Sequence, residues 1–189
     1  MILAMQFPDR VQRWARRCVE VKNLAARGHF DGTAEQQYTG VIGEACFRRL
    51  CSGSWPDMST PGHDNGVDLR LRIEGEREAV DVKTLARSVP IQEDFTHHFP
   101  TCQAHHPATV LVFLNRIKGQ NTIEFCGWIY KRHALHSFPV IEKGQRRPCG
   151  YGRSFVTKTQ CVEIPQEDLR TIMAKRLRVE METTTMETW

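Results

Sequence analysis

The spacing of apolar residues predicts two amphipathic helices in the first quarter of the chain. Residues 9–27 repeat apolar side chains at helical spacing, and Gly28 follows as a C-terminal cap. Residues 33–51 repeat the same pattern. Thr33 and Gln36 form a capping-box sequence at the start of the second helix.

Two glycines interrupt the second predicted helix. A glycine in a helix interior costs about 1 kcal/mol relative to alanine, because it loses more backbone freedom on folding. Close approach of another backbone therefore explains Gly40 and Gly43 better than chance does.

The pattern then changes from helical to alternating, which predicts a β-hairpin over residues 68–84. A four-residue turn at 74–77 pairs residues whose numbers sum to 151, so Asp68 faces Lys83. Directly opposed side chains lie about 5 Å apart, and Asp81 shares their face at one end of the ribbon. The opposite, core-facing side carries Leu69, Leu71, Ile73, Val80 and Val82.

The second half of the chain predicts more strands and a final helix. The apolar run at 108–115 is typical of a central strand covered on both faces, and 122–130 predicts another strand. A helix over about 165–178 begins at Pro165 with an acidic first turn. The remaining expected elements are a long, partly helical connection at 86–107 and a short strand at 159–164.

Length and composition indicate one domain over residues 1–189, with an N-terminal helical part over about 1–51. The chain is 40% hydrophobic and 25% charged, which excludes disordered and collagen-like classes. It has no run near the roughly 18 apolar residues of a membrane span. The sequence therefore predicts a cytoplasmic protein without a membrane partner.

Seven scattered cysteines without a C-x-x-C pair predict reduced thiols rather than a disulfide framework. Four of them have apolar neighbours in the sequence, and free cysteine usually behaves as a small buried hydrophobe. The cysteines expected to be buried are Cys18, Cys46, Cys126 and Cys161.

Positive charge is concentrated in residues 131–158, although the whole chain carries only +4. This segment has seven basic residues against one acidic residue, an excess of +6, which favours a polyanionic partner. Glycines and prolines between Pro139 and Gly152 predict a mobile loop rather than a helix face in that stretch, and a solvated basic loop without a partner is the alternative. The candidate nucleic-acid-binding residues are Lys143, Arg146, Arg147 and Arg153.

The polar face of the predicted hairpin suits metal-dependent hydrolysis. Neighbouring carboxylates such as Asp68 and Asp81 are the oxygen ligands that Mg²⁺ takes alongside water and substrate phosphate. A lysine such as Lys83 can orient a water or stabilise charge on the phosphorane. The alternative is an exposed cross-strand salt bridge, which contributes little.

Three segments in order carry a resemblance to a known family: Gly40-Val-Ile-Gly43-Glu44, Gly66-Val-Asp68-Leu and Val80-Asp81-Val-Lys83-Thr84. Over residues 33–130 the chain resembles the PD-(D/E)XK nuclease superfamily, which includes restriction endonucleases and Holliday-junction resolvases. The resemblance implies a restriction-endonuclease-like α/β fold, with a central mixed β-sheet flanked by helices. One departure is Val67, which stands where the motif has proline.

The resemblance implies a metal-dependent endonuclease that hydrolyses phosphodiester bonds, with DNA as the favoured substrate. It implies that Asp68 and Asp81 bind Mg²⁺, with Mn²⁺ as a substitute, and that Glu44 completes the metal shell. Lys83 would position or activate the attacking water. The resemblance also favours a homodimer, since two copies can cut two strands.

Alternatives to this interpretation stay open at the level of sequence. The protein can be a non-catalytic nucleic-acid-binding or inhibitory protein that retains the nuclease fold, or a metal-free scaffold in which the same residues form salt bridges. Asp64 is a rival to Asp68 as the first metal ligand, and Thr84 either contacts a phosphate or ends the strand. In the His-rich stretch 97–106, Cys102 and His105 have ligand-like spacing, so a structural zinc site is a further alternative.

Overall fold

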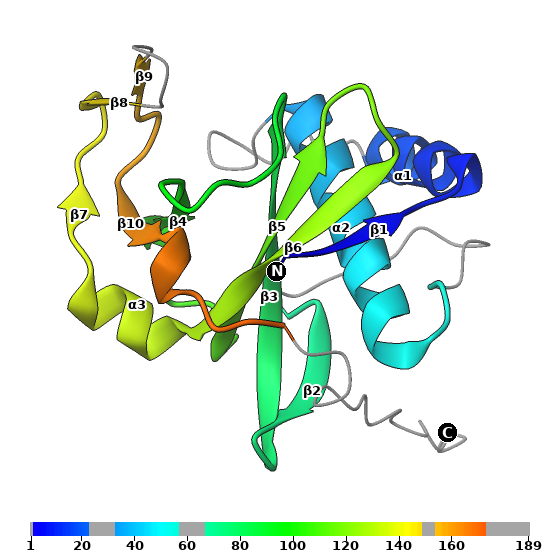
Figure 1. Ribbon diagram of the computed structural model, residues 1–189, viewed down its shortest axis with the longest axis horizontal. Helices are drawn as coiled ribbons and strands as arrows, with labels where there is room; N and C mark the ends of the chain where they lie inside the picture. Colours follow the sequence, from blue (N-terminus) through cyan, green and yellow to red (C-terminus); the bar gives the residue numbers. More distant parts are fainter. Residues whose placement is uncertain (1, 23–32, 57–66, 149–153, 173–189) are drawn as a thin grey trace.

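The computed structural model describes residues 2–22, 33–56, 67–148 and 154–172 of the chain, and these form a mixed α/β fold (Figure 1). The described helices are α1 (Asp9–Lys22), α2 (Ala34–Ser52) and α3 (Lys131–Ser137). A five-stranded sheet has the order β1-β6-β5-β3-β2, with β1 (Leu3–Gln6), β2 (Leu69–Ile73), β3 (Glu76–Arg87), β5 (Val110–Ile117) and β6 (Thr122–Tyr130). A three-stranded sheet has the order β4-β10-β7, with β4 (Thr96–Pro100), β7 (Val140–Ile141) and β10 (Cys161–Pro165). β8 (Arg146–Pro148) pairs with β9 (Ser154–Val156), and short 3₁₀ turns are η2 (Thr101–Gln103) and η3 (Gln166–Asp168).

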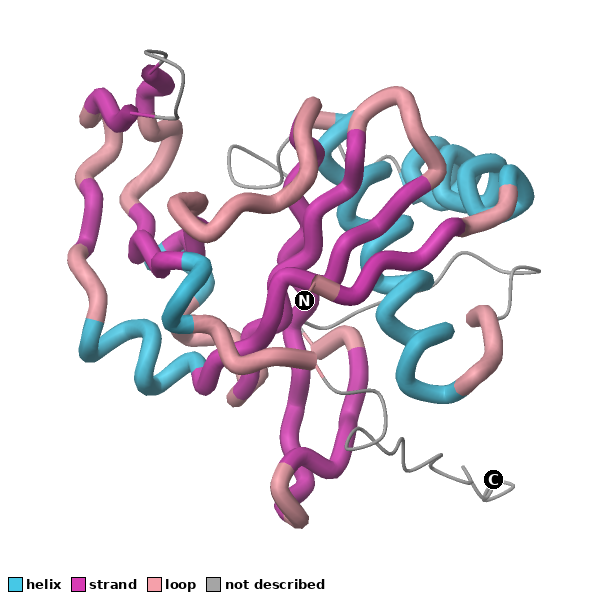
Figure 2. Tube along the Cα trace, in the orientation of Figure 1, coloured by secondary structure: helices cyan, strands magenta, loops and turns pink. Residues whose placement is uncertain are grey.

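The molecule is layered around the central sheet. Helices α1 and α2 cover one face, and the three-stranded sheet lies on the other side (Figure 2). One apolar cluster joins α1 and α2 to the sheet residues Val80, Val82 and Val112. A second cluster on the opposite face joins Leu111 and Phe113 to the smaller sheet. Both faces of the central strand β5 are therefore buried, which agrees with its continuous apolar sequence.

The two predicted helices are confirmed within the described residues. Thr33 caps α2 through a complete capping box: its hydroxyl accepts a bond from the Gln36 N–H, and the Gln36 side chain accepts one from the Thr33 N–H. The predicted end of the first helix, including Gly28, lies outside the described residues. The purely helical N-terminal part was wrong at Leu3–Gln6, because β1 pairs with β6 there.

The predicted hairpin is confirmed, but its turn was wrong. Glu74 and Gly75 form a two-residue turn with φ values of 55° and 95°, the signs that a type I′ turn requires. Leu69 therefore pairs with Val80, and paired numbers sum to 149 rather than 151. A shift of two residues keeps every side chain on its predicted face, but it aligns Asp68 with Asp81 instead of Lys83.

The strands predicted at 108–115 and 122–130 are confirmed as β5 and β6. β5 runs parallel to β3, with Val80 opposite Val110, and antiparallel to β6. A β-bulge interrupts the β5–β6 pairing between Phe113 and Leu114. The strand predicted at 159–164 is confirmed as β10.

Two predicted elements differ from the structure because tertiary pairing overrides local propensity. The connection at 86–107 contains strand β4, which pairs with β10, and its only described helical part is the 3₁₀ turn η2. The helix predicted at 165–178 was wrong over its described part, since η3 is one 3₁₀ turn. Arg170 then exchanges two backbone hydrogen bonds of 2.9 Å with Trp128 of β6, which holds the chain extended. Residues 173–178 lie outside the described residues.

The basic segment is more ordered than the predicted mobile loop. α3, β7 and the β8–β9 hairpin occupy most of it, and the hairpin lies at the end of the second layer away from the helices (Figure 1). Residues 149–153 lie outside the described residues. Within the described part of the stretch predicted as a loop, 139–148, the structure has the short strands β7 and β8 joined by a turn and has no helix.

The four cysteines expected to be buried are buried, and each is a free thiol. Burial raises the pKa of Cys46 and Cys126 to about 12, so these thiols stay protonated at neutral pH. No described helix is both long and apolar enough to cross a membrane.

Candidate active site

An ion pair on β3 forms the centre of the candidate site. Lys83 Nζ lies 2.8 Å from Asp81 Oδ2, and both side chains point away from α2 because they alternate with Val80 and Val82 of the helix-side core. Asp81 is 6% exposed, whereas the Lys83 side chain is 22% exposed. Lys83 Nζ also lies 5.8 Å from the centre of the Phe99 ring on β4. The pair is therefore half-buried between the two sheets, with its ammonium nearer to solvent.

Asp68 joins this pair at the edge of the central sheet. β2 begins only at Leu69, and the Asp68 N–H donates to the Val80 carbonyl at 2.9 Å. The side chain then turns to β3, where Asp68 Oδ2 accepts a 2.6 Å hydrogen bond from the Val82 N–H. The structure therefore brings Asp68 beside Asp81 by a side-chain bond to the backbone, not by the cross-strand Asp68–Lys83 pair expected from a four-residue turn.

Glu44 approaches from the helix side of the sheet. Its neighbour Gly43 packs directly on Thr84 of β3, so a Cβ at Gly43 would lie 1.8 Å from Thr84 Oγ1. Arg48, one helical turn after Glu44, donates to the Asp68 carbonyl at 3.4 Å. Half-buried Glu44 thus lies on the part of α2 that faces Thr84 and Asp68, across the sheet from the Asp81–Lys83 pair.

The two sequence alternatives near this site have different outcomes. The Thr84 hydroxyl is buried without a hydrogen-bond partner, and β3 continues beyond it to Arg87. Thr84 therefore neither ends the strand nor presents its hydroxyl to solvent. Asp64 lies outside the described residues.

The donors of the site fit Mg²⁺ in kind. Asp68 and Asp81 supply carboxylate oxygens from adjacent positions, and Mg²⁺ is commonly held by one or two carboxylates with water and phosphate oxygens. Within the described ranges no three His, Cys, Asp or Glu side chains are grouped closely enough to hold a metal ion by themselves. A metal here would therefore rely on the two aspartates, because Glu44 lies on the other face of the sheet from the Asp81–Lys83 pair.

Two further basic side chains share the face of the Asp81–Lys83 pair. Lys131, the first residue of α3, donates its ammonium to the His106 carbonyl. The pKa of His106 is lowered by burial, and the charges of His105, Lys83 and Lys131 lower it further while Asp81 opposes them. The sequence showed Lys131 only as one member of the basic segment, because its proximity to β3 depends on how β5 and β6 pair.

The predicted nucleic-acid-binding residues are in different environments. Arg147 forms an ion pair with the buried carboxylate of Glu163, which His98 and Thr96 also contact. Arg146 is exposed on β8 and donates to Ser154 Oγ at 2.7 Å. Lys143 is exposed in the turn before β8, and Arg153 lies outside the described residues.

The His-rich stretch is part of the second sheet. His97 Nε2 lies 2.7 Å from Gln166 Oε1, and its ring packs on Phe113 at 5.0 Å between centroids. His98 Nε2 lies 3.4 Å from Glu163 Oε1. Cys102 follows on η2, and His105 packs edge-on against His106. These histidines therefore have structural partners within the protein.

No family model, no curated protein and no solved structure matches the chain. A function is therefore inferred from the chain's own residues. The candidate set for such an inference is Asp68, Asp81 and Lys83.

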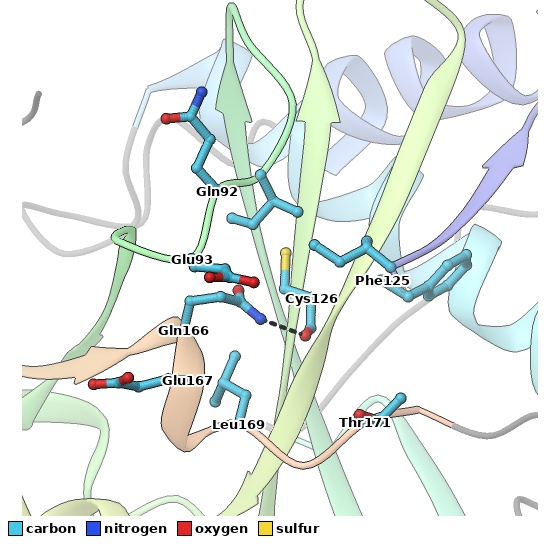
Figure 3. Close-up of a pocket in the computed structure, with 10 residues that line it drawn as sticks. Gln92, Glu93, Phe125, Cys126, Gln166, Glu167, Leu169 and Thr171 are labelled. Atoms are coloured by element: carbon cyan, nitrogen blue, oxygen red, sulfur yellow. Dashed lines mark hydrogen bonds between the residues drawn. The ribbon is translucent and has the colours of Figure 1, made fainter. Parts of the chain in front are cut away.

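A pocket of about 470 Å³ lies away from these residues, between β6 and the turn after β10. In Figure 3, Gln92 and Glu93 approach it from one side and Gln166, Glu167 and Leu169 from the other, with Cys126 between them. The Cys126 thiol, with its raised pKa, is no nucleophile. Exposed Glu93 and Glu167 would repel a polyanion. This pocket does not fit the substrate that the β3 residues indicate.

Proposed function

We propose that the protein is a Mg²⁺-dependent nuclease of the PD-(D/E)XK type that hydrolyses phosphodiester bonds, with DNA as the favoured substrate. One observation carries the proposal: Asp68 is bonded to the backbone of β3 at Val82, between Asp81 and Lys83, which pair at 2.8 Å. Two carboxylates and one ammonium thus lie at neighbouring positions next to the first residue pair of β2 and β3.

The architecture supports the proposal at the level of the fold. A mixed sheet has helices on one face, and the hairpin β2–β3 carries the three polar residues. Two features distinguish the chain from a sheet flanked by helices on both sides: a three-stranded sheet covers the second face, and the crossover between parallel β3 and β5 contains strand β4. The restriction-endonuclease-like assignment is accordingly part of the proposal.

Each residue has a distinct role in the proposed reaction. Asp68 and Asp81 would hold Mg²⁺, whereas Glu44, on the other face of the sheet, is given no ligand role. When bound, Mg²⁺ supplies positive charge that makes water a better nucleophile and stabilises the developing phosphorane. Lys83 would orient the attacking water and stabilise negative charge through its ammonium, which Asp81 fixes in place. The Val82 N–H fixes the Asp68 carboxylate.

The proposal is tested by incubation with labelled duplex, single-stranded and branched DNA and RNA in Mg²⁺, in Mn²⁺ and in EDTA. We expect cleavage in either metal and none in EDTA. Asp81→Asn and Lys83→Ala should each reduce cleavage at least about 100-fold, because each removes a group that acts in the transition state. Glu76→Gln, an exposed change on the same hairpin, is the matched control and should cut like the wild type.

The variants also need a folding control, since Asp81 is buried. Asp81→Asn keeps the side-chain volume, and its circular dichroism spectrum and melting temperature should remain close to those of the wild type. A folded Asp81→Asn or Lys83→Ala protein that cuts at the wild-type rate contradicts the assignment. Magnesium-dependent cleavage that persists in both variants places the active site elsewhere.

A non-catalytic nucleic-acid-binding or inhibitory role is the second candidate. It is favoured by the lack of a ready three-ligand metal group among the described residues and by the pairing of Lys83 with Asp81. Under this alternative the wild type binds a nucleic acid in EDTA but cuts none of the substrates. Exposed Lys143 and Arg146, with Arg153, would supply the backbone contacts in either case. A homodimer would present two Asp68–Asp81–Lys83 sites, one to each strand of a nucleic-acid duplex.

A further inference from the structure

Lys131 is tied by two hydrogen bonds to the segment that precedes β5. Its main-chain N–H donates to the Thr109 carbonyl at 2.8 Å, and its ammonium donates to the His106 carbonyl. Both ends of the residue are therefore fixed to residues 106–109, which lead into β5. A lysine anchored in this way loses less freedom when it binds a ligand than one that moves in solvent.

The strand register places Lys131 on the same side of the sheet as the ion pair. Val80, Val110 and Tyr130 lie in one row across β3, β5 and β6, so Asp81, Leu111 and Ile129 form the next row. Leu111 and Ile129 belong to the core cluster on the face away from α2. Lys131 directly follows Tyr130 and reaches back over this face to His106.

The electrostatic interactions agree with this placement. The pKa of Lys131 is lowered by burial first, raised by the charge of Asp81, and lowered by the charge of Lys83. The Lys131 ammonium is therefore within range of the charges of Asp81 and Lys83 on β3. Lys83 and Lys131 carry two positive charges, which the carboxylates of Asp81 and Asp68 balance when no ligand is bound.

Among the described residues Lys131 forms no ion pair with a carboxylate, so its ammonium remains suited to an anionic ligand. The Lys131 ammonium has three protons, and its bond to the His106 carbonyl uses one. A phosphate group offers several acceptor oxygens and a full negative charge, which matches the donors that remain. The pocket lined by Glu93 and Glu167 carries negative charge and would repel a phosphate.

We propose that Lys131 binds a backbone phosphate of the nucleic acid beside the phosphodiester that the Asp68, Asp81 and Lys83 site holds. This proposal rests on the proposed function for the identity of the ligand. It makes Lys131 a substrate-positioning residue on α3, separate from the basic β8–β9 hairpin. The His106 carbonyl keeps the Lys131 ammonium directed at the site when no substrate is bound.

The test compares three variants by fluorescence anisotropy with a labelled single-stranded DNA oligonucleotide and a labelled duplex in EDTA, where metal-dependent cleavage cannot occur. Lys131→Gln retains a donor for the His106 carbonyl but removes the charge, and Lys131→Arg retains the charge. Arg132→Ala removes the neighbouring exposed charge of α3 and is the matched control.

We expect Lys131→Gln to weaken binding about tenfold at low salt, as loss of a charge-assisted contact does. It should also lower the slope of log affinity against log salt by roughly 0.7 to 0.9. Lys131→Arg should retain most of the wild-type affinity and salt slope. Arg132→Ala should change the affinity and the slope less than Lys131→Gln does. Melting temperatures establish that the variants are folded.

A folded Lys131→Gln protein with the affinity and salt slope of the wild type overturns the inference. So does an equal loss in Arg132→Ala, because the effect would then reflect general charge on α3. Binding is measured separately from cleavage, so the two proposals fail separately. A wild type that binds through Lys131 but cuts no substrate supports this inference and contradicts the nuclease.

Discussion

Gly43 determines how closely α2 approaches β3. A Cβ at this position would lie 1.8 Å from Thr84 Oγ1 and 2.8 Å from Thr84 Cβ, so no side chain fits without moving the helix or the strand. Gly40, one turn earlier, meets nothing within 4 Å. The expected approach of another backbone is wrong at Gly40, and at Gly43 the close neighbour is the side chain of Thr84. This contact matters for the site because Glu44 follows directly.

The two glycines should respond oppositely to alanine. Gly43→Ala should lower the free energy of unfolding by about 1–3 kcal/mol, as overpacking of a core does. Gly40→Ala should raise it by up to about 1 kcal/mol through helix propensity. Urea denaturation of both variants measures the difference. Equal effects at the two positions would show that the Gly43–Thr84 contact does not limit the packing of α2.

At the scale of single residues, the sequence predicted the members of the site better than their bonds. Asp68, Asp81 and Lys83 could be grouped because strand alternation survives a register shift of two residues. The bond from the Val82 N–H to Asp68 could not be predicted, since it depends on where β2 begins. Lys131 could not be assigned either, because its position requires the order of three strands.

The β8–β9 hairpin combines one structural arginine with one exposed arginine. Arg147 pairs with Glu163, and burial would raise the pKa of this carboxyl, but hydrogen bonds from Arg147 and His98 hold it below its usual value. Arg146, on the adjacent position of β8, points its guanidinium to Ser154 and solvent. The same strand therefore attaches to the second sheet through one residue and presents charge through the next.

Single substitutions should separate these two roles. Arg147→Ala should lower the free energy of unfolding by about 1–3 kcal/mol, because it leaves a buried carboxylate without its strongest partner. Arg146→Ala should leave stability unchanged but weaken nucleic-acid binding and reduce its salt slope by roughly 0.7 to 0.9. Urea denaturation and anisotropy on both variants provide the measurements. A stable Arg147→Ala protein with reduced binding would reverse the assignment.

At the scale of elements, local patterns predicted the helices and the central strands but not the turn or the final segment. The Glu74–Gly75 turn places a glutamate at positive φ, whereas the usual sequences for this turn have asparagine or aspartate. The segment after Pro165 carries helix-start residues, yet Arg170 pairs with Trp128. Gly127 allows this because a Cβ there would lie 2.6 Å from Leu169 Cβ. Sequence periodicity predicts neither the pairing of Arg170 with Trp128 nor the contact of Gly127 with Leu169.

At the scale of the whole molecule, the two sheets are in contact through His97 of β4, whose ring packs on Phe113 of β5. His97 is 1% exposed. Gln166 Nε2 donates to the Cys126 carbonyl at 2.8 Å, so Gln166 Oε1 accepts from His97 Nε2. His97 Nδ1 is then a buried nitrogen without a described partner. Burial lowers the pKa of His97 to about 4, and the Gln166 bond only partly opposes it.

This neutral histidine should make stability depend on pH. In the unfolded chain His97 binds a proton below about pH 6.5, whereas in the folded chain it does so only below about pH 4. The contribution of His97 to the free energy of unfolding is therefore fully present above pH 6.5 and is lost as the pH falls from 6.5 to 4. The loss from His97 should be on the order of 3 kcal/mol. Urea denaturation at several pH values measures it. The free energy of unfolding of His97→Gln should fall less steeply as the pH is lowered. Some pH dependence remains from His98, whose pKa is also lowered by burial.

Exposed His136 provides the control for this measurement. His136→Asn should keep the pH dependence of the wild type. If His97→Gln keeps it too, His97 is not the group that couples protonation to the packing of the two sheets. The sequence placed His97 in a connection, because the strand β4 becomes evident only once β10 lies beside it.

The pairing of β1 with β6 has a consequence for synthesis on the ribosome. Leu3 is made more than a hundred residues before its partner Phe125. Until then β1 and the exposed apolar side chains of Ile2 and Leu3 have no strand to join. The nascent chain can form α1 and α2 early, since their contacts are local, whereas the edge of the sheet closes late. Expression conditions that slow translation, or a chaperone that covers the N-terminal segment, should therefore affect the yield of folded protein more than its final stability.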